Sequence, residues 1–99
     1  MAKYLLTYKG TGEPMPEPTP EQGQAIMQAW MEWGGKAGSA IVDFGAPVAP
    51  IGGADKTIGG YSILEASDAD ALNALLEGHP HVAQGGTIDV HELQAIPGM

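Results

Sequence analysis

Apolar side chains alternate along residues 3–8 with the period of two that marks a β-strand. Tyr4, Leu6 and Tyr8 fall on one face, and Leu5 and Thr7 fall on the other. A strand with apolar side chains on both faces is usually covered on both faces. The pattern therefore predicts a first strand that is enclosed from two sides.

A helical period begins after a loop at residues 9–20, which carries four prolines. Thr19-Pro20-Glu21 is typical of a helix start, because threonine can cap, proline suits the first helical position and glutamate favours the positive end of the helix dipole. Four apolar residues then recur at helical spacing: Ile26, Trp30, Trp33 and Ala37. The pattern predicts an amphipathic helix that ends at about Gly38.

A second, shorter strand is predicted at residues 40–44. Strict alternation places Ile41 and Asp43 on one face, with Val42 and Phe44 on the other. Residues 45–56 contain two prolines and several glycines, and they predict a rigid loop rather than a flexible linker.

The second half of the chain repeats the order of strand, helix and strand. A third strand is predicted at residues 57–65, and Ser67-Asp68-Ala69-Asp70 resembles a capping box that opens a second helix. That helix has a stripe of three leucines and is predicted to end near Gly78. A last strand is predicted at residues 87–93, followed by a tail.

The resulting order, βαββαβ, predicts one α+β domain over residues 1–99. Two amphipathic helices would pack on one face of a four-stranded antiparallel sheet, which is the ferredoxin-like arrangement. The other face would still carry apolar side chains and would need cover. These side chains are Leu5 or Leu6, Ile41 or Val42, and Leu93. A second copy of the chain is the simplest cover, so we expect a homodimer that forms an α+β barrel.

Composition narrows the classes of partner. The 99 residues include four lysines, no arginine and twelve acidic residues, for a net charge of −8. Such a surface repels polyanions, so we expect no nucleic-acid partner. With no cysteine there is neither a disulfide framework nor a zinc–sulfur site, and we expect no cofactor and no metal. No apolar run approaches the roughly 20 residues of a membrane span, and no signal peptide stands out, which predicts a cytoplasmic protein and no membrane partner.

Several segments together resemble the YCII-related (YciI/DGPF) domain family. They are Lys3-Tyr4-Leu5-Leu6, Ala29-Trp30, Val42-Asp43, Lys56-Thr57, Gly60-Tyr61-Ser62-Ile63, Pro80-His81 and Gly85-Gly86-Thr87-Ile88-Asp89-Val90. The resemblance covers nearly the whole chain and implies a ferredoxin-like fold that dimerises into an α+β barrel. It implies no settled reaction. Asp43 matches an acid after the second strand and Asp89 an acid in the last strand, but the first helix lacks the histidine of some relatives, and the Asp-Gly-Pro-Phe motif is absent.

Histidine is the natural acid–base candidate near neutral pH. His81 lies in the turn before the last strand, where loops at sheet ends often carry functional residues. His79 follows the second helix and is interpreted as an exposed cap of its negative end. Together, His79 and His81 form only a weak metal-binding pair, because no third ligand stands nearby.

Asp89 and His91 are two residues apart on a strand and therefore project from the same face. If that face lines the interior of the barrel, the carboxylate could orient the imidazole as a general base. If the strand lies at the sheet edge, both side chains are simply solvated. Asp43 is either a turn-forming carboxylate or a group at a cavity mouth.

The leading functional hypothesis is a small enzyme that uses acid–base chemistry on a compact neutral or weakly charged organic molecule. Its candidate catalytic residues are Asp43, His81, Asp89 and His91. The main alternative is a non-catalytic ligand-binding or accessory module. A third hypothesis, by analogy of fold alone, is a cofactor-free oxygenase-like barrel that acts on an aromatic substrate.

Overall fold

The computed structural model describes residues 1–10 and 18–98. Most of the loop predicted at residues 9–20, and the last residue of the predicted tail, lie outside this part of the chain. The elements are β1 (Ala2–Lys9), α1 (Pro20–Ala37), a short 3₁₀ turn η1 (Gly38–Ala40), β2 (Ile41–Asp43), β3 (Ile58–Ala66), α2 (Ala69–Leu76), α3 (Pro80–Ala83) and β4 (Thr87–Glu92). All four predicted strands and both predicted helices are present.

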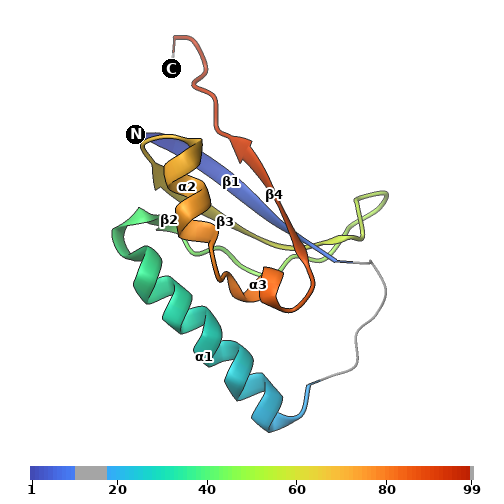
Figure 1. Cartoon of the computed structure of the whole chain (residues 1–99). Helices are drawn as coiled ribbons and strands as arrows, with labels where there is room; N and C mark the ends of the chain where they lie inside the picture. The colour runs from blue at the N-terminus through green and yellow to red at the C-terminus, as the bar shows by residue number, and fades with distance from the viewer. Residues whose placement is uncertain (11–17, 99) are drawn as a thin grey trace.

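The four strands form one antiparallel sheet in the order β2-β3-β1-β4. Leu6 lies at its centre, opposite Ser62 of β3 on one side and Val90 of β4 on the other. Both long helices pack against the same side of the sheet (Figure 1). This is the predicted ferredoxin-like α+β arrangement.

Helix α1 starts where the sequence indicates. The Thr19 hydroxyl accepts a hydrogen bond from the Gln22 backbone N–H, and the Gln22 side chain accepts one from the Thr19 N–H. This reciprocal pair satisfies two N–H groups that the first turn would otherwise leave unpaired. The helix ends at Gly38, which adopts a φ of +53°, a conformation that glycine reaches without steric cost.

The core lies between the helices and the face of β1 that carries Tyr4, Leu6 and Tyr8, all of them buried as predicted. Trp33 of α1 is also buried, and its indole Nε1 donates to the carbonyl of Leu75 at 2.9 Å. The two helices are thereby joined by a hydrogen bond as well as by apolar contact. None of the described helices is long and apolar enough to cross a bilayer.

Three local predictions were wrong. The second helix is capped by Asp68 rather than Ser67, because the Asp68 carboxylate accepts the Ala71 N–H. Residues 80–83 form the short helix α3, which was not predicted. Phe44 was predicted on the strand face opposite Ile41, but it packs on the helix side, as Ile41 does. Its ring centroid lies 6.1 Å from the ring centroids of both Trp30 and Trp33. The register of β2 shifts between residues 41 and 43, and such an irregularity breaks the strict alternation on which that prediction rested.

Candidate active site

A cavity of about 740 Å³ lies between α1 and one end of the sheet. Its walls are mostly apolar, and four aromatic residues line it: Tyr8, Trp30, Phe44 and Tyr61. Residues 44–47, which follow β2, and His81 of α3 also line the cavity. The volume and the apolar lining are those of a small-molecule site.

Glycines allow the backbone to approach closely around this cavity. A Cβ atom on Gly34 of α1 would lie 3.0 Å from Cε2 of Phe44, so the glycine lets the phenyl ring pack against the helix. Gly45 has a φ of +86°, and a Cβ atom there would overlap the carbonyl oxygen of Tyr61. The wall that follows β2 therefore depends on glycine at position 45.

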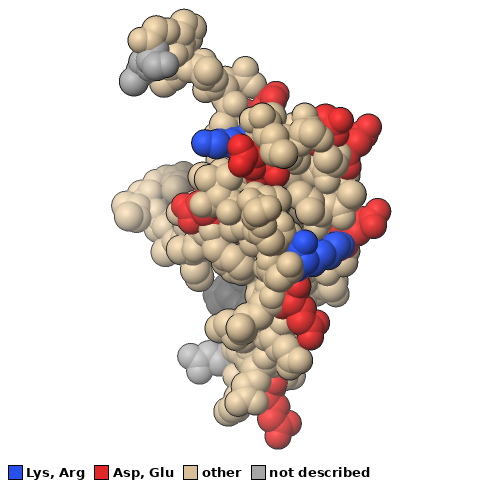
Figure 2. Space-filling model, turned by 90° about the vertical axis from the view of Figure 1, so that its left-hand side faces the viewer, with Lys and Arg blue, Asp and Glu red and all other residues tan. Residues whose placement is uncertain are grey.

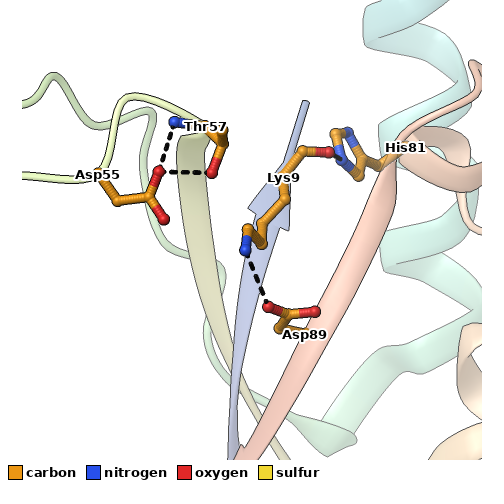
Figure 3. Close-up of polar contacts among 5 residues, drawn as sticks. All are labelled: Lys9, Asp55, Thr57, His81 and Asp89. Carbon is orange, nitrogen blue, oxygen red and sulfur yellow. Dashed lines mark hydrogen bonds and ion pairs between the residues drawn. The ribbon is translucent and has the colours of Figure 1, made fainter. Parts of the chain in front are cut away.

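His81 is the candidate residue that the fold brings to the cavity. It lies half-buried in α3, with its ring centroid 5.3 Å from that of Tyr8. Its Nε2 lies 2.8 Å from the carbonyl oxygen of Lys9, and a carbonyl can only accept, so Nε2 carries the proton (Figure 3). The neutral imidazole then keeps its lone pair on Nδ1, the atom required of a proton acceptor.

The His81 ring fits because Gly86 has no side chain. A Cβ atom on Gly86 would overlap the imidazole of His81. Gly86 lies directly before β4, where the backbone N–H of Gly86 also donates to the carbonyl of His81 at 3.0 Å. Gly86 thus makes room for the histidine that lines the cavity.

The cavity wall differs in charge from the rest of the molecule. Acidic side chains outnumber lysines on the surface seen in Figure 2, in keeping with the net charge of −8. Among the described residues that line the cavity, none is acidic, whereas Lys56 and His81 are both present. The neighbouring Asp55 accepts hydrogen bonds from the N–H and the hydroxyl of Thr57. The bond from the hydroxyl, and then the bond from the N–H, lower the pKa of Asp55. That carboxylate is therefore occupied within its own loop (Figure 3).

His79 lies beneath the cavity and is completely buried, so its interpretation as an exposed cap was wrong. It packs among Tyr8, Trp30 and Trp33, with ring centroids 5.1, 4.8 and 4.3 Å away. Burial, and then the charge of nearby His81, lower the pKa of His79 from 6.5 to about 4. At neutral pH it is an uncharged core residue. No local sequence signal indicates this, because the aromatic residues around it come from β1 and α1.

Asp43 ends β2 and forms the turn into the cavity wall. Its carboxylate accepts the Gly45 N–H at 2.8 Å and the Tyr61 hydroxyl at 3.3 Å. The negative charge of Asp43, followed by this hydrogen bond, raises the pKa of the Tyr61 phenol. Asp43 is itself exposed, and the Tyr61 side chain that it contacts projects from the sheet face without helices, because Tyr61 is opposite Thr7.

Asp89 and His91 lie on β4, at the edge of the sheet, and both are exposed. Asp89 is opposite Thr7 and His91 opposite Leu5, so both project from the face without helices. Asp89 forms an ion pair with Lys9, with Nζ and Oδ2 3.4 Å apart (Figure 3). The structure therefore separates these two residues from His81, which Lys9 contacts through its backbone carbonyl. Within the described residues, no group of three potential metal ligands occurs.

Comparison with known proteins shows a likeness of fold to solved structures. No family model matches the chain, and no curated protein matches it either. Among solved structures, the chain is similar to 5-chloro-2-hydroxyhydroquinone dehydrochlorinase (TftG) from Burkholderia phenoliruptrix AC1100, determined in complex with 2,5-dihydroxybenzoquinone. The identity is 20%, the TM-score is 0.57, and the match covers 93% of each chain. The two share a fold. Membership of the YCII-related family stays a prediction.

Proposed function

We propose that this protein is a small enzyme that moves protons on a compact aromatic or quinone-like molecule bound between α1 and the sheet. The observation that carries the proposal is the position of His81. It contributes an imidazole to a mostly apolar cavity with aromatic side chains in its wall, and its Nδ1 keeps a lone pair. A histidine with this access can act as a general base and return the proton as a general acid.

The cavity wall favours a flat ring that bears a weakly acidic hydroxyl. Tyr8, Trp30 and Phe44 offer aromatic surface on which a ring can pack. Lys56 offers a positive charge for an ionised hydroxyl. TftG was determined with 2,5-dihydroxybenzoquinone, a molecule of this type, which supports the same ligand class for this chain.

The proposed chemistry needs only proton transfer. Nδ1 of His81 removes a proton from a ring hydroxyl, and the resulting anion is reprotonated at a ring carbon, so that atoms and electrons balance without an oxidant. Tyr8 is a poor base for this step, because its hydroxyl already donates to Ser62 at 2.7 Å and burial raises the pKa of its phenol.

The test is exchange of ring protons of hydroxyhydroquinone in D₂O without oxygen, followed by proton NMR. Replacing His81 by Gln retains a side-chain N–H that can reach the Lys9 carbonyl but removes the imidazole base. We expect His81→Gln to lower the enzyme-catalysed rate at least about 100-fold, the usual contribution of a general base. The matched variant His91→Gln, on the exposed edge strand, should stay within about twofold of the wild type. Equal losses in both variants would contradict the role of His81.

A non-catalytic ligand-binding module is the second candidate function, and one observation favours it. The Nε2 of His81 is bonded to a backbone carbonyl and not to a carboxylate. A carboxylate partner stabilises the imidazolium form during catalysis, whereas a carbonyl does so less strongly. Under this alternative, the probe binds in the cavity but its ring protons exchange no faster than in buffer.

A homodimer remains part of the proposal. The sheet face opposite the helices carries Leu5 and Ile63, both only half-covered, together with Asp89 and His91. A second copy packed there would bury these apolar side chains. Sedimentation at micromolar concentration should then give twice the chain mass of 10.2 kDa. A stable species of the single-chain mass would exclude this dimer.

A further inference from the structure

Buried His79 contacts His81 through the backbone rather than through the cavity. The backbone N–H of His81 donates to Nδ1 of His79 at 3.0 Å, so that His79 caps the first turn of α3. His79 is fully buried and does not line the cavity. It therefore has no direct access to a bound molecule, and any influence on the chemistry must act through its neighbours.

The hydrogen bonds around His79 have only one consistent direction. A backbone N–H can only donate, so Nδ1 must hold a lone pair and the neutral ring carries its proton on Nε2. Nε2 then donates to the Tyr8 hydroxyl at 3.3 Å. That hydroxyl donates to Ser62 at 2.7 Å, and the Ser62 hydroxyl donates to the Phe44 carbonyl at 2.6 Å. Each hydroxyl accepts one bond and donates one.

This chain of hydrogen bonds joins the parts that form the cavity. It runs from α3 to β1, from β1 to β3, and from β3 to the residue that follows β2. Tyr8 and Phe44 line the cavity themselves, and the next residue on β1, Lys9, accepts the hydrogen bond from the His81 ring. Two adjacent residues of β1 therefore hold His79, which caps α3, and His81, which lies within it.

We propose that His79 is the positioning residue of the site, a neutral histidine of fixed tautomer that holds the backbone of His81 and the hydroxyl of Tyr8 in place. This inference rests on the proposed function of His81. The His81 backbone is fixed by His79 and its ring by Lys9, while Gly86 leaves the space that the ring fills. His79 thus determines where the Nδ1 lone pair of His81 is presented.

Two substitutions separate the two bonds of His79. In His79→Asn, the side-chain oxygen can still accept the His81 N–H as a helix cap, but no group reaches Tyr8. In His79→Gln, the side-chain amide can still donate to Tyr8, but the cap is lost. Both variants remove the same buried ring, so both should lose stability to a similar extent. A purely structural role for His79 predicts the same behaviour of the site in both.

The positioning role predicts different behaviour. We expect His79→Asn to keep the hydroxyhydroquinone exchange rate within about threefold of the wild type, and His79→Gln to lower it at least tenfold. In NMR spectra of the unliganded protein, the protected Nε2–H proton of His81 should remain in His79→Asn and disappear in His79→Gln. Equal effects of the two substitutions on this proton would overturn the proposal.

One further test uses the wild-type protein alone, so it depends neither on the folding of a variant nor on catalytic turnover. A scalar coupling across the hydrogen bond between the His81 amide nitrogen and Nδ1 of His79, with ¹⁵N shifts showing the proton of His79 on Nε2, would support the positioning role. Absence of the coupling, or a proton on Nδ1, would overturn it. Because this readout requires no substrate, it can succeed even if the exchange assay shows that the protein is not a catalyst.

Discussion

Gly45→Ala should cost the protein at least about 4 kcal/mol of unfolding free energy, an unusually large effect for one methyl group. The added Cβ atom would overlap the Tyr61 carbonyl oxygen, and the φ of +86° is one that alanine rarely adopts. Small domains have only about 5–15 kcal/mol in total. We therefore expect the variant to be largely unfolded at temperatures that the wild type tolerates.

The backbone cannot easily move away from this clash. Asp43 accepts the Gly45 N–H, and the neighbouring Ala46 carbonyl accepts the Tyr61 N–H at 3.3 Å. Val48 N–H donates to the Gly59 carbonyl at 3.0 Å, which ties the segment to the start of β3. A shift of the segment would break these hydrogen bonds and open the cavity wall.

Gly53→Ala is the matched control for this prediction. Gly53 has no positive φ, and a Cβ atom there would meet nothing within 4 Å. This substitution should change the unfolding free energy by no more than about 0.5 kcal/mol. Urea denaturation followed by circular dichroism measures both variants. A Gly45→Ala protein within 1 kcal/mol of Gly53→Ala, taken as about the resolution of such measurements, would show that the described wall does not form.

Lowering the pH from 7 to 4 should remove about 3 kcal/mol of stability through His79 alone. The unfolded chain protonates this histidine below about 6.5, whereas the folded protein does so only as the pH approaches about 4. Between these values the unfolded state binds more protons, so the free energy of unfolding falls as the pH falls. The contribution is complete above pH 6.5 and is lost by about pH 4.

The difference between the wild type and His79→Gln isolates this effect, because the carboxylates titrate in both proteins. Urea denaturation at several pH values from 7 to 4, at one protein concentration, gives the two curves. We expect the stability advantage of the wild type over His79→Gln to shrink steadily toward pH 4. A constant difference across this range would mean that His79 takes up protons equally well in the folded and unfolded states, and is therefore not buried as a neutral ring.

The sequence predicts the fold well where one local pattern suffices. The alternation along residues 3–8 predicts the strand β1 but leaves open which face meets the helices, and Thr19 followed by the tryptophan stripe predicts α1. Such patterns repeat over several residues, so one exception does not change the interpretation. Phe44 shows the limit, because a single shift of register in β2 moves its ring to the helix side.

The site depends on contacts that no local pattern contains. Periodicity correctly places Asp89 and His91 on one face of β4, but not the cavity, which lies on the other side of the sheet. His81 was a candidate because it lies in a loop before a strand, and the fold brings it to the cavity. The burial of His79 follows from Trp30 and Trp33, which are more than 40 positions away in the sequence.

A compact ring should bind between α1 and the sheet, beside His81. The most direct test is a titration of the ¹⁵N-labelled protein with 2,5-dihydroxybenzoquinone, followed by two-dimensional amide and indole spectra. We predict saturable shifts at the Trp30 indole, at the amides of Gly45 and Gly60, and at the ring of His81, with His91 unchanged. Shifts confined to β4 and His91, or no saturable shifts at millimolar probe, would contradict the account.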